Sequence, residues 1–131
     1  MGCKRIPIHK RAMGKFSEVI AGSGAVTAAS NTKLLDASAG RQPVVEALKF
    51  DASNTSVDYV ELINGGADGT GTDSIIKFRP GPMGKFELDE PLGPWSGLAN
   101  WPKNGEQLNY AVAVTAGTPT WTLTCDLGYA Q

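Results

Sequence analysis

Hydrophobic and polar residues alternate with a period of two along much of the chain, and helical periodicity is sustained almost nowhere. A period of two is typical of β-strands, because successive side chains of a strand point to opposite faces of the sheet. The alternating runs are rich in Val, Ile, Phe, Tyr, Thr and Trp, and they are separated by Gly, Pro and Asn. This pattern predicts an all-β fold, a jelly-roll or Greek-key sandwich of about eight short strands.

Eight runs of this kind are predicted as strands. The fourth run carries apolar side chains on both faces, which predicts an inner strand that is covered on each side. One helical candidate, residues 26–40, is interrupted by polar residues at positions 30–32 and is not favoured. The predicted strands span residues 15–22, 24–30, 44–52, 56–64, 74–80, 85–91, 107–116 and 120–130.

The last two runs are predicted to close the chain as an antiparallel hairpin that turns at residues 117–119. Cys125 falls on the apolar face of the final run, so we expect it to pack as a small hydrophobe rather than act as a reactive thiol. The side chains that the alternation assigns to buried faces are Leu108, Tyr110, Val112, Val114, Trp121, Leu123, Cys125, Leu127 and Tyr129.

The composition fits one globular domain. A chain of 131 residues is long enough to bury a core without metal or disulfide staples. Its apolar content of 41% is that of a globular protein, so the 16 glycines and eight prolines indicate many turns rather than disorder. We predict an extended basic N-terminal arm over residues 1–15 and a single β-sandwich domain over residues 16–131.

The net charge of −1 hides an asymmetry along the chain. Residues 1–20 hold five of the 12 basic residues and one of the 13 acidic residues, so a basic arm precedes a mildly acidic body. We expect the arm to contact its own domain or, preferentially, a neighbouring subunit. A solvated tail is the alternative, and nucleic acid is not favoured as a partner. The predicted interface residues of the arm are Cys3, Lys4, Arg5, His9, Lys10 and Arg11.

The sequence offers no catalytic or metal-binding motif. His9 is the single histidine and has no neighbouring carboxylate, so a Ser-His-Asp arrangement is not supported. Asp68 and Asp73 lie in a Gly-rich loop that lacks a calcium-loop pattern, and the carboxylates of residues 87–90 are expected on a solvated strand face. We therefore expect no enzymatic activity and no cofactor. A membrane-spanning helix is not expected either, because no run of about 18 apolar residues is present.

The two cysteines, Cys3 and Cys125, form no CxxC motif, so a zinc or redox site is not supported. The alternative to simple packing of Cys125 is a disulfide with Cys3, within a chain or between subunits. Such a bond would pin the arm, and it requires the two Cα atoms to come within roughly 7 Å.

Two of the three tryptophans, Trp95 and Trp101, lie in a connection rich in Pro and Gly. They are expected to cap one open end of the sandwich. The alternatives are a subunit interface, in which Trp is enriched, or a platform on which sugar rings stack, together with Tyr110.

The C-terminal part of the sequence resembles small β-sandwich proteins of tailed bacteriophage virions. The resemblance covers about residues 84–131 and rests on "KFELDEPLGPW", "GEQLNYAVAVTAG" and "TWTLTCDLGYAQ". In those proteins a G-E-x-L opening leads into the penultimate strand, and the last strand ends near an aromatic residue. The matching positions here are Gly105, Glu106, Leu108 and Tyr129.

This resemblance implies a non-enzymatic structural role, that of a capsid decoration (cement) protein. Such a protein would bind the major capsid protein or other virion proteins, and it would bridge capsid subunits through its arm and loops. It would form a homo-oligomer, with a trimer favoured, and it would lie on the surface of the virion after synthesis in the host cytoplasm. The alternatives are a tail or neck component of the virion and a carbohydrate- or receptor-binding β-sandwich module.

Overall fold

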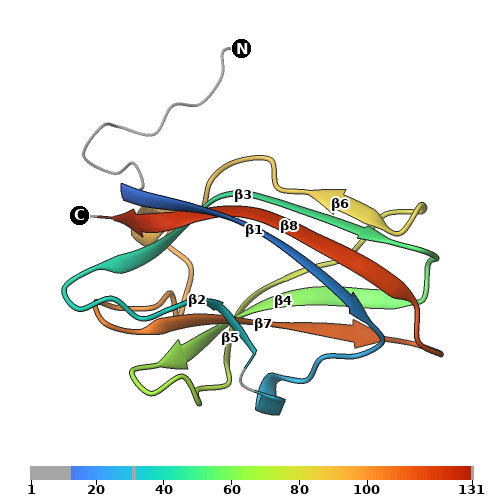
Figure 1. Ribbon diagram of the computed structural model, residues 1–131, viewed down its shortest axis with the longest axis horizontal. Helices are drawn as coiled ribbons and strands as arrows, with labels where there is room; N and C mark the ends of the chain where they lie inside the picture. Colours follow the sequence, from blue (N-terminus) through green and yellow to red (C-terminus); the bar gives the residue numbers. More distant parts are fainter. Residues whose placement is uncertain (1–12, 31, 131) are drawn as a thin grey trace.

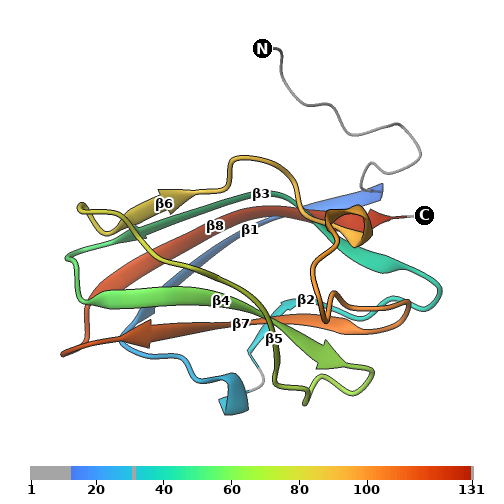
Figure 2. The ribbon, with the colours of Figure 1, turned by 180° about the vertical axis from the view of Figure 1, so that it is seen from behind.

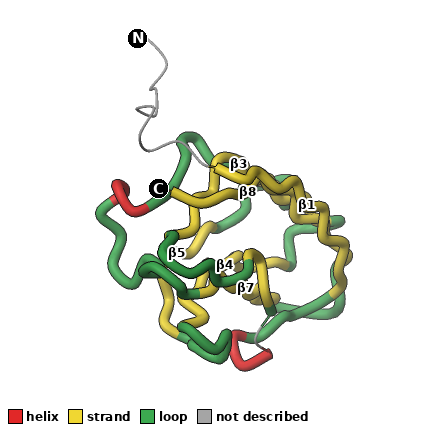
Figure 3. The backbone as a smooth tube through the Cα atoms, turned by 60° about the vertical axis from the view of Figure 1, so that its left-hand side comes forward, coloured by secondary structure: helices red, strands yellow, loops and turns green. Residues whose placement is uncertain are grey.

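The computed structural model describes residues 13–30 and 32–130. These residues form eight strands and two short 3-10 helices, and the strands make two sheets that stack as layers (Figures 1 and 3). The predicted all-β sandwich is therefore confirmed. The strands are β1 (Met13–Ser23), β2 (Lys33–Leu35), β3 (Gln42–Ala52), β4 (Val57–Gly66), β5 (Asp73–Phe78), β6 (Lys85–Glu87), β7 (Gln107–Val114) and β8 (Thr120–Ala130), and the 3-10 helices are η2 (Ala28–Ser30) and η3 (Pro94–Ser96).

The strand order is that of a jelly roll. The first sheet has the order β1-β8-β3-β6 and the second has the order β2-β7-β4-β5. The antiparallel pairs β1·β8, β2·β7, β3·β6 and β4·β5 make one long hairpin of the whole chain. This hairpin is rolled up so that β3 also pairs with β8 and β4 with β7 (Figure 2). Each sheet therefore combines two of these antiparallel pairs: β1·β8 with β3·β6 in the first sheet, and β2·β7 with β4·β5 in the second.

The predicted C-terminal hairpin is wrong, because β7 and β8 lie in opposite sheets. Both edges of each strand are occupied by partners distant in sequence: β2 and β4 flank β7, while β1 and β3 flank β8. The predicted faces are nevertheless correct. Eight of the nine side chains assigned to the interior are buried, and Val114 is half-buried. Alternation determines which face of a strand is buried, but it does not determine the partner strand.

The second predicted strand is also wrong. In residues 24–30 the chain makes one isolated bridge, between Val26 and Val112, and then forms η2. The strand β2 comes later, where Leu34 and Leu35 are both buried in succession. Consecutive buried residues break the period of two, so the pattern concealed this strand.

The ends of the other strands shift by a few residues. The strand β1 begins at Met13, so it takes in the last three residues of the segment that the sequence suggested as an arm. The strand β4 lies between β5 and β7, which confirms the prediction of an inner strand for this run.

Trp121 of β8 holds the end of the sandwich together. Its ring centroid lies 5.9 Å from that of Phe50 in β3 and 6.3 Å from that of Tyr110 in the opposite sheet. Its indole Nε1 donates a hydrogen bond of 2.9 Å to the carbonyl oxygen of Gly24. Gly24 N–H donates to Pro119, which has no N–H to return, so the indole satisfies a carbonyl that the strand ladder leaves open.

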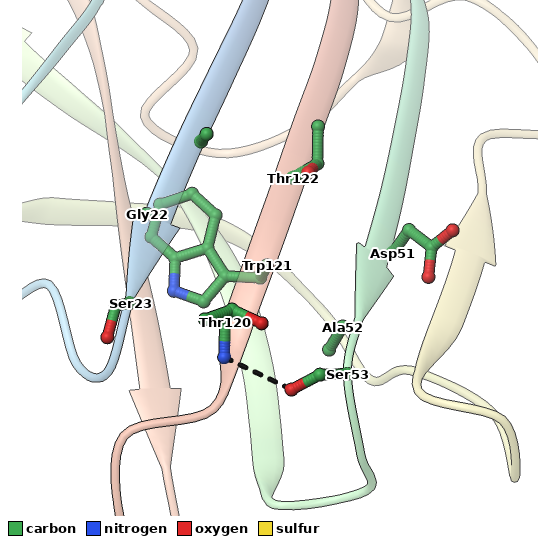
Figure 4. A pocket seen from close by; sticks show the side chains of 9 residues that line it. Gly22, Ser23, Asp51, Ala52, Ser53, Thr120, Trp121 and Thr122 are labelled. Carbon is green, nitrogen blue, oxygen red and sulfur yellow. Dashed lines mark hydrogen bonds between the residues drawn. The ribbon is translucent and has the colours of Figure 1, made fainter.

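The ring of Trp121 lies across β1 at Gly22 (Figure 4). A Cβ atom placed on Gly22 would stand 2.4 to 2.9 Å from three atoms of the indole ring. The backbone of Gly22 has no positive φ, so the constraint on this position is steric and not conformational. The close approach of β1 to the core therefore requires glycine here.

We predict that Gly22→Ala lowers the free energy of unfolding by roughly 1–3 kcal/mol, because the new methyl group must displace the buried indole. Urea unfolding followed by tryptophan fluorescence measures the change. Gly81→Ala is the matched control, since Gly81 also lacks a positive φ and its nearest neighbour to a new Cβ is an oxygen at 3.6 Å. Equal stability losses in the two variants would refute the steric role of Gly22.

Candidate interaction surfaces

The strand β1 presents an apolar edge to solvent. It lies at the end of the first sheet and pairs, among the residues described, with β8 alone. Phe16 is 46% exposed and Val19 is 69% exposed, and Met83 is the third large hydrophobic side chain that the described residues expose. Large exposed apolar side chains on one strand mark a surface suited to contact with another protein.

Phe16 and Val19 were not among the residues that the sequence predicted for an interface. The signal was present, because the run 15–22 has apolar side chains at Phe16 and Ile20 on one face and at Val19 and Ala21 on the other. What the pattern could not supply was the position of the strand at an edge. That position depends on pairing with β8, whose residues are 97 to 116 positions away from their partners in β1.

A shallow hollow lies where β1, β8 and β3 run side by side (Figure 4). It has a volume of about 570 Å³ and opens broadly to solvent. Among its lining residues, Ser53 Oγ accepts a hydrogen bond of 3.1 Å from the backbone N–H of Thr120. Asp51 lies 3.7 Å from the ammonium of Lys85. The hollow is lined by short side chains, by hydroxyl groups and by the carboxylate of Asp51.

A second groove, of about 340 Å³, runs along β7 on the outer face of the other sheet. Residues 25–28 form one wall, and Tyr59 and Glu61 form the other. Glu61 is 9% exposed. The ammonium of Lys77 stands 4.6 Å above the centre of the Tyr59 ring, a cation–π contact that fixes this wall. The residues of β7 that line the groove are small or apolar, and Glu61 is its one charged lining residue.

The aromatic residues of the connection before β7 face inward. Trp101 is 7% exposed, and its Nε1 donates a hydrogen bond of 3.0 Å to the carbonyl oxygen of Pro43. Trp95 in η3 is half-buried and packs on Val44 and Ala130. The arrangement is that of a cap on one end of the sandwich. Tyr110 is 4% exposed and contacts Trp121, so the three rings do not form a common platform for stacking.

The Gly-rich loop between β4 and β5 is folded on itself. Asp68 accepts hydrogen bonds from the hydroxyl and the backbone N–H of Thr70, at 2.7 and 3.0 Å, and these bonds lower the pKa of Asp68. Asn109, fully buried in β7, donates to the carbonyl oxygen of Gly69 at 3.0 Å. Asp68 thus serves as a turn residue. Asn109, which the sequence did not reveal as important, anchors the loop.

Cys125 is 1% exposed and lies in the main core cluster, which confirms its predicted packing role. Burial, with smaller contributions from the charges of Glu18 and Asp126, raises the pKa of its thiol to about 12. Cys125 forms no disulfide with any residue that the structure describes. Its bond with Cys3 stays a prediction, because Cys3 lies outside the described residues.

The other predicted arm residues, Lys4, Arg5, His9, Lys10 and Arg11, also lie outside the described residues. Within residues 13–30 and 32–130, no group of three or more His, Cys, Asp or Glu side chains is placed to hold a metal ion. Across the same ranges no helix has the length and apolar character needed to span a membrane.

Comparison of the chain with models of protein families, with curated proteins and with solved structures found no match.

We predict that the thiol of Cys125 is unreactive toward alkylating reagents in the folded protein. In a Cys3→Ser variant at pH 8, its reaction with a maleimide should be roughly a thousandfold slower than in the urea-unfolded chain. The thiol's pKa rises from 9.0 to about 12 on folding, so the thiolate fraction falls by that factor. Mass spectrometry of timed samples measures the rates. Similar rates in the two states would mean that Cys125 is accessible.

Proposed function

We propose that this protein is a non-enzymatic structural protein of a tailed bacteriophage virion that decorates the capsid and bridges capsid subunits. The observation that carries the proposal is the exposed apolar edge of β1 on a jelly-roll sandwich. Jelly rolls are a recurrent architecture of virion proteins, so the fold supports a virion role by analogy. The sequence resemblance over residues 84–131 points the same way.

The proposed partners are the major capsid protein or other virion proteins, together with further copies of this chain. Attachment would combine burial of exposed strand and loop surfaces with docking of the basic arm. Each contact is small by itself, but many symmetrically arranged copies on one particle multiply weak contacts into firm attachment. The protein would be made in the host cytoplasm and act on the particle surface.

A carbohydrate-binding role has less support in the geometry. Two of the three rings that the sequence suggested for stacking on sugars, Trp101 and Tyr110, are buried in the sandwich. Stacking on a sugar needs an accessible aromatic face, and only half-buried Trp95 retains part of one.

The experiment that tests the role is the composition of purified particles. Virions banded on a density gradient should contain the chain at many copies per particle, as measured by quantitative mass spectrometry. Electron microscopy with a specific antibody should label the capsid surface. Labelling confined to the tail or neck would instead identify the protein as a component of those structures. Absence of the chain from banded particles would refute a virion role.

We further predict that removal of residues 1–12 weakens attachment to particles about tenfold or more, because four basic side chains are lost. The cut is placed at residue 12 because Met13 already pairs with Tyr129. Co-sedimentation with particles stripped of the protein measures binding, and circular dichroism checks that the sandwich is intact. Lys103→Gln, a change at an exposed loop lysine, is the control and should bind normally. Unchanged binding by the truncated chain would exclude the arm from attachment.

A further inference from the structure

The four sheet edges of the sandwich are not equally protected. The edge strands are β1 and β6 in the first sheet and β2 and β5 in the second. The strands β2 and β6 have three residues each, and β5 carries the exposed Lys77 and ends just before Pro80. Short length, lysine and proline are the usual means by which proteins prevent strand edges from pairing with other chains.

The strand β1 has none of these devices over residues 16–23. It is 11 residues long in total, and the sequence "FSEVIAGS" contains no lysine, arginine or proline. Its single charge is Glu18. Two of the three large hydrophobic side chains that the described residues expose, Phe16 and Val19, belong to this strand.

The register of β1 shows which backbone groups face the open edge. Pairing with β8 runs without a shift from Phe16–Leu127 to Ser23–Thr120, and beyond it Gly24 N–H donates to the Pro119 carbonyl at 3.0 Å. Hydrogen-bonded pairs alternate along an antiparallel ladder. The even-numbered residues of β1 therefore bond to β8, and residues 17, 19, 21 and 23 turn their N–H and C=O groups outward.

The other side of β8 agrees with this assignment. Ser53 N–H donates to the carbonyl oxygen of Thr120 at 2.8 Å, so the even-numbered residues of β8 bond to β3. The odd-numbered residues of β8 are left for β1, as the pairing of Gly22 with Trp121 requires.

We propose that the open edge of β1 pairs with β1 of a second copy of this chain, antiparallel about a two-fold axis, so that two first sheets join into one. In this register Val19 lies opposite Val19 of the second copy. The outward-facing backbone of Ser17 bonds to that of Ala21 in the other chain, and the reverse. The contact is self-complementary, as a two-fold interface must be, and it adds about six backbone hydrogen bonds, two for each bonded pair.

Charge selects this register over its neighbour. Centring the pair on Glu18, the middle of β1, would maximise the overlap but would set Glu18 directly against Glu18 of the second copy. Like charges directly opposite each other destabilise a strand pair. A shift to Val19 places Glu18 opposite Ile20 and covers the most exposed apolar side chain of the strand.

The same register also sets Phe16 of one chain opposite Gly22 of the other. On that face the indole of Trp121 already covers Gly22, so the partner's Phe16 ring would pack beside the indole and not over the glycine itself.

The first test is the mass of the full-length protein in light scattering. We expect twice the chain mass of 13.8 kDa, and we expect Val19→Lys to give the monomer while its circular dichroism spectrum is unchanged. Met83→Lys is the matched control, since Met83 is 73% exposed and lies outside every strand, and it should remain dimeric. A wild-type monomer at the highest soluble concentration, a trimer, or equal effects of the two lysines would overturn the proposal.

The second test fixes the register and does not depend on a destabilising change. In a Cys3→Ser background, Val19→Cys should form a disulfide-linked dimer under mild oxidation, because bonded antiparallel partners have Cα atoms about 5.5 Å apart. Ala21→Cys should not, since its own counterpart lies four residues along the partner strand. Non-reducing gels measure both. Cross-linking at position 21 but not at position 19 would overturn the register.

The two-fold pair and the virion role both draw on the exposed edge of β1, but different measurements test them: the mass in solution and the composition of particles. If the chain is found on particles but is trimeric in solution, the virion proposal survives and the edge pairing fails. If it is a dimer that is absent from particles, the reverse holds.

Discussion

The packing of Trp121 is the interaction on which the sandwich depends most. One side chain contacts Phe50 in its own sheet and Tyr110 in the opposite sheet, and its indole N–H satisfies a carbonyl just beyond β1. Because the ring needs the space that a side chain at position 22 would fill, it determines a residue of β1 as well as the core. The stability of the fold and the path of its edge strand are therefore linked through one aromatic residue.

The outer surfaces follow from this arrangement. On the face of β1 toward the core, Trp121 and its neighbours limit the size of the side chains. Val19 lies on the other face, opposite Thr124. The edge beyond Val19 is open among the described residues, and residues 16–23 of β1 contain no lysine, whereas the other three edges are short or carry lysine. Three edges of the sandwich thus resist pairing with another chain, and one edge is suited to such pairing. This difference between the edges is useful to a protein that assembles, because it limits pairing to one place.

The sequence predicted which side chains of a strand are buried far better than it predicted which strands pair with each other. Alternation in residues 107–130 identified the buried side chains of β7 and β8, but it suggested a hairpin where the structure has strands of opposite sheets. Pairing is decided by contacts between distant segments, such as Pro43 with Tyr129, and no local pattern contains them. The same limit hid β2, where Leu34 and Leu35 are buried in succession, and the anchoring role of Asn109, whose partner Gly69 lies 40 residues away.

Glu18 explains why an open apolar edge need not cause uncontrolled aggregation. It alternates onto the side of the sheet that faces the core, yet its side chain is exposed, and its register partner is the buried Cys125. A charge directed inward on an edge strand is a known obstacle to indiscriminate pairing. Here the obstacle is at the middle of the strand, so it penalises the fully overlapped pair and leaves the register centred one residue further along. The charge therefore gives the edge specificity, while Val19 and Phe16 supply the area to be buried.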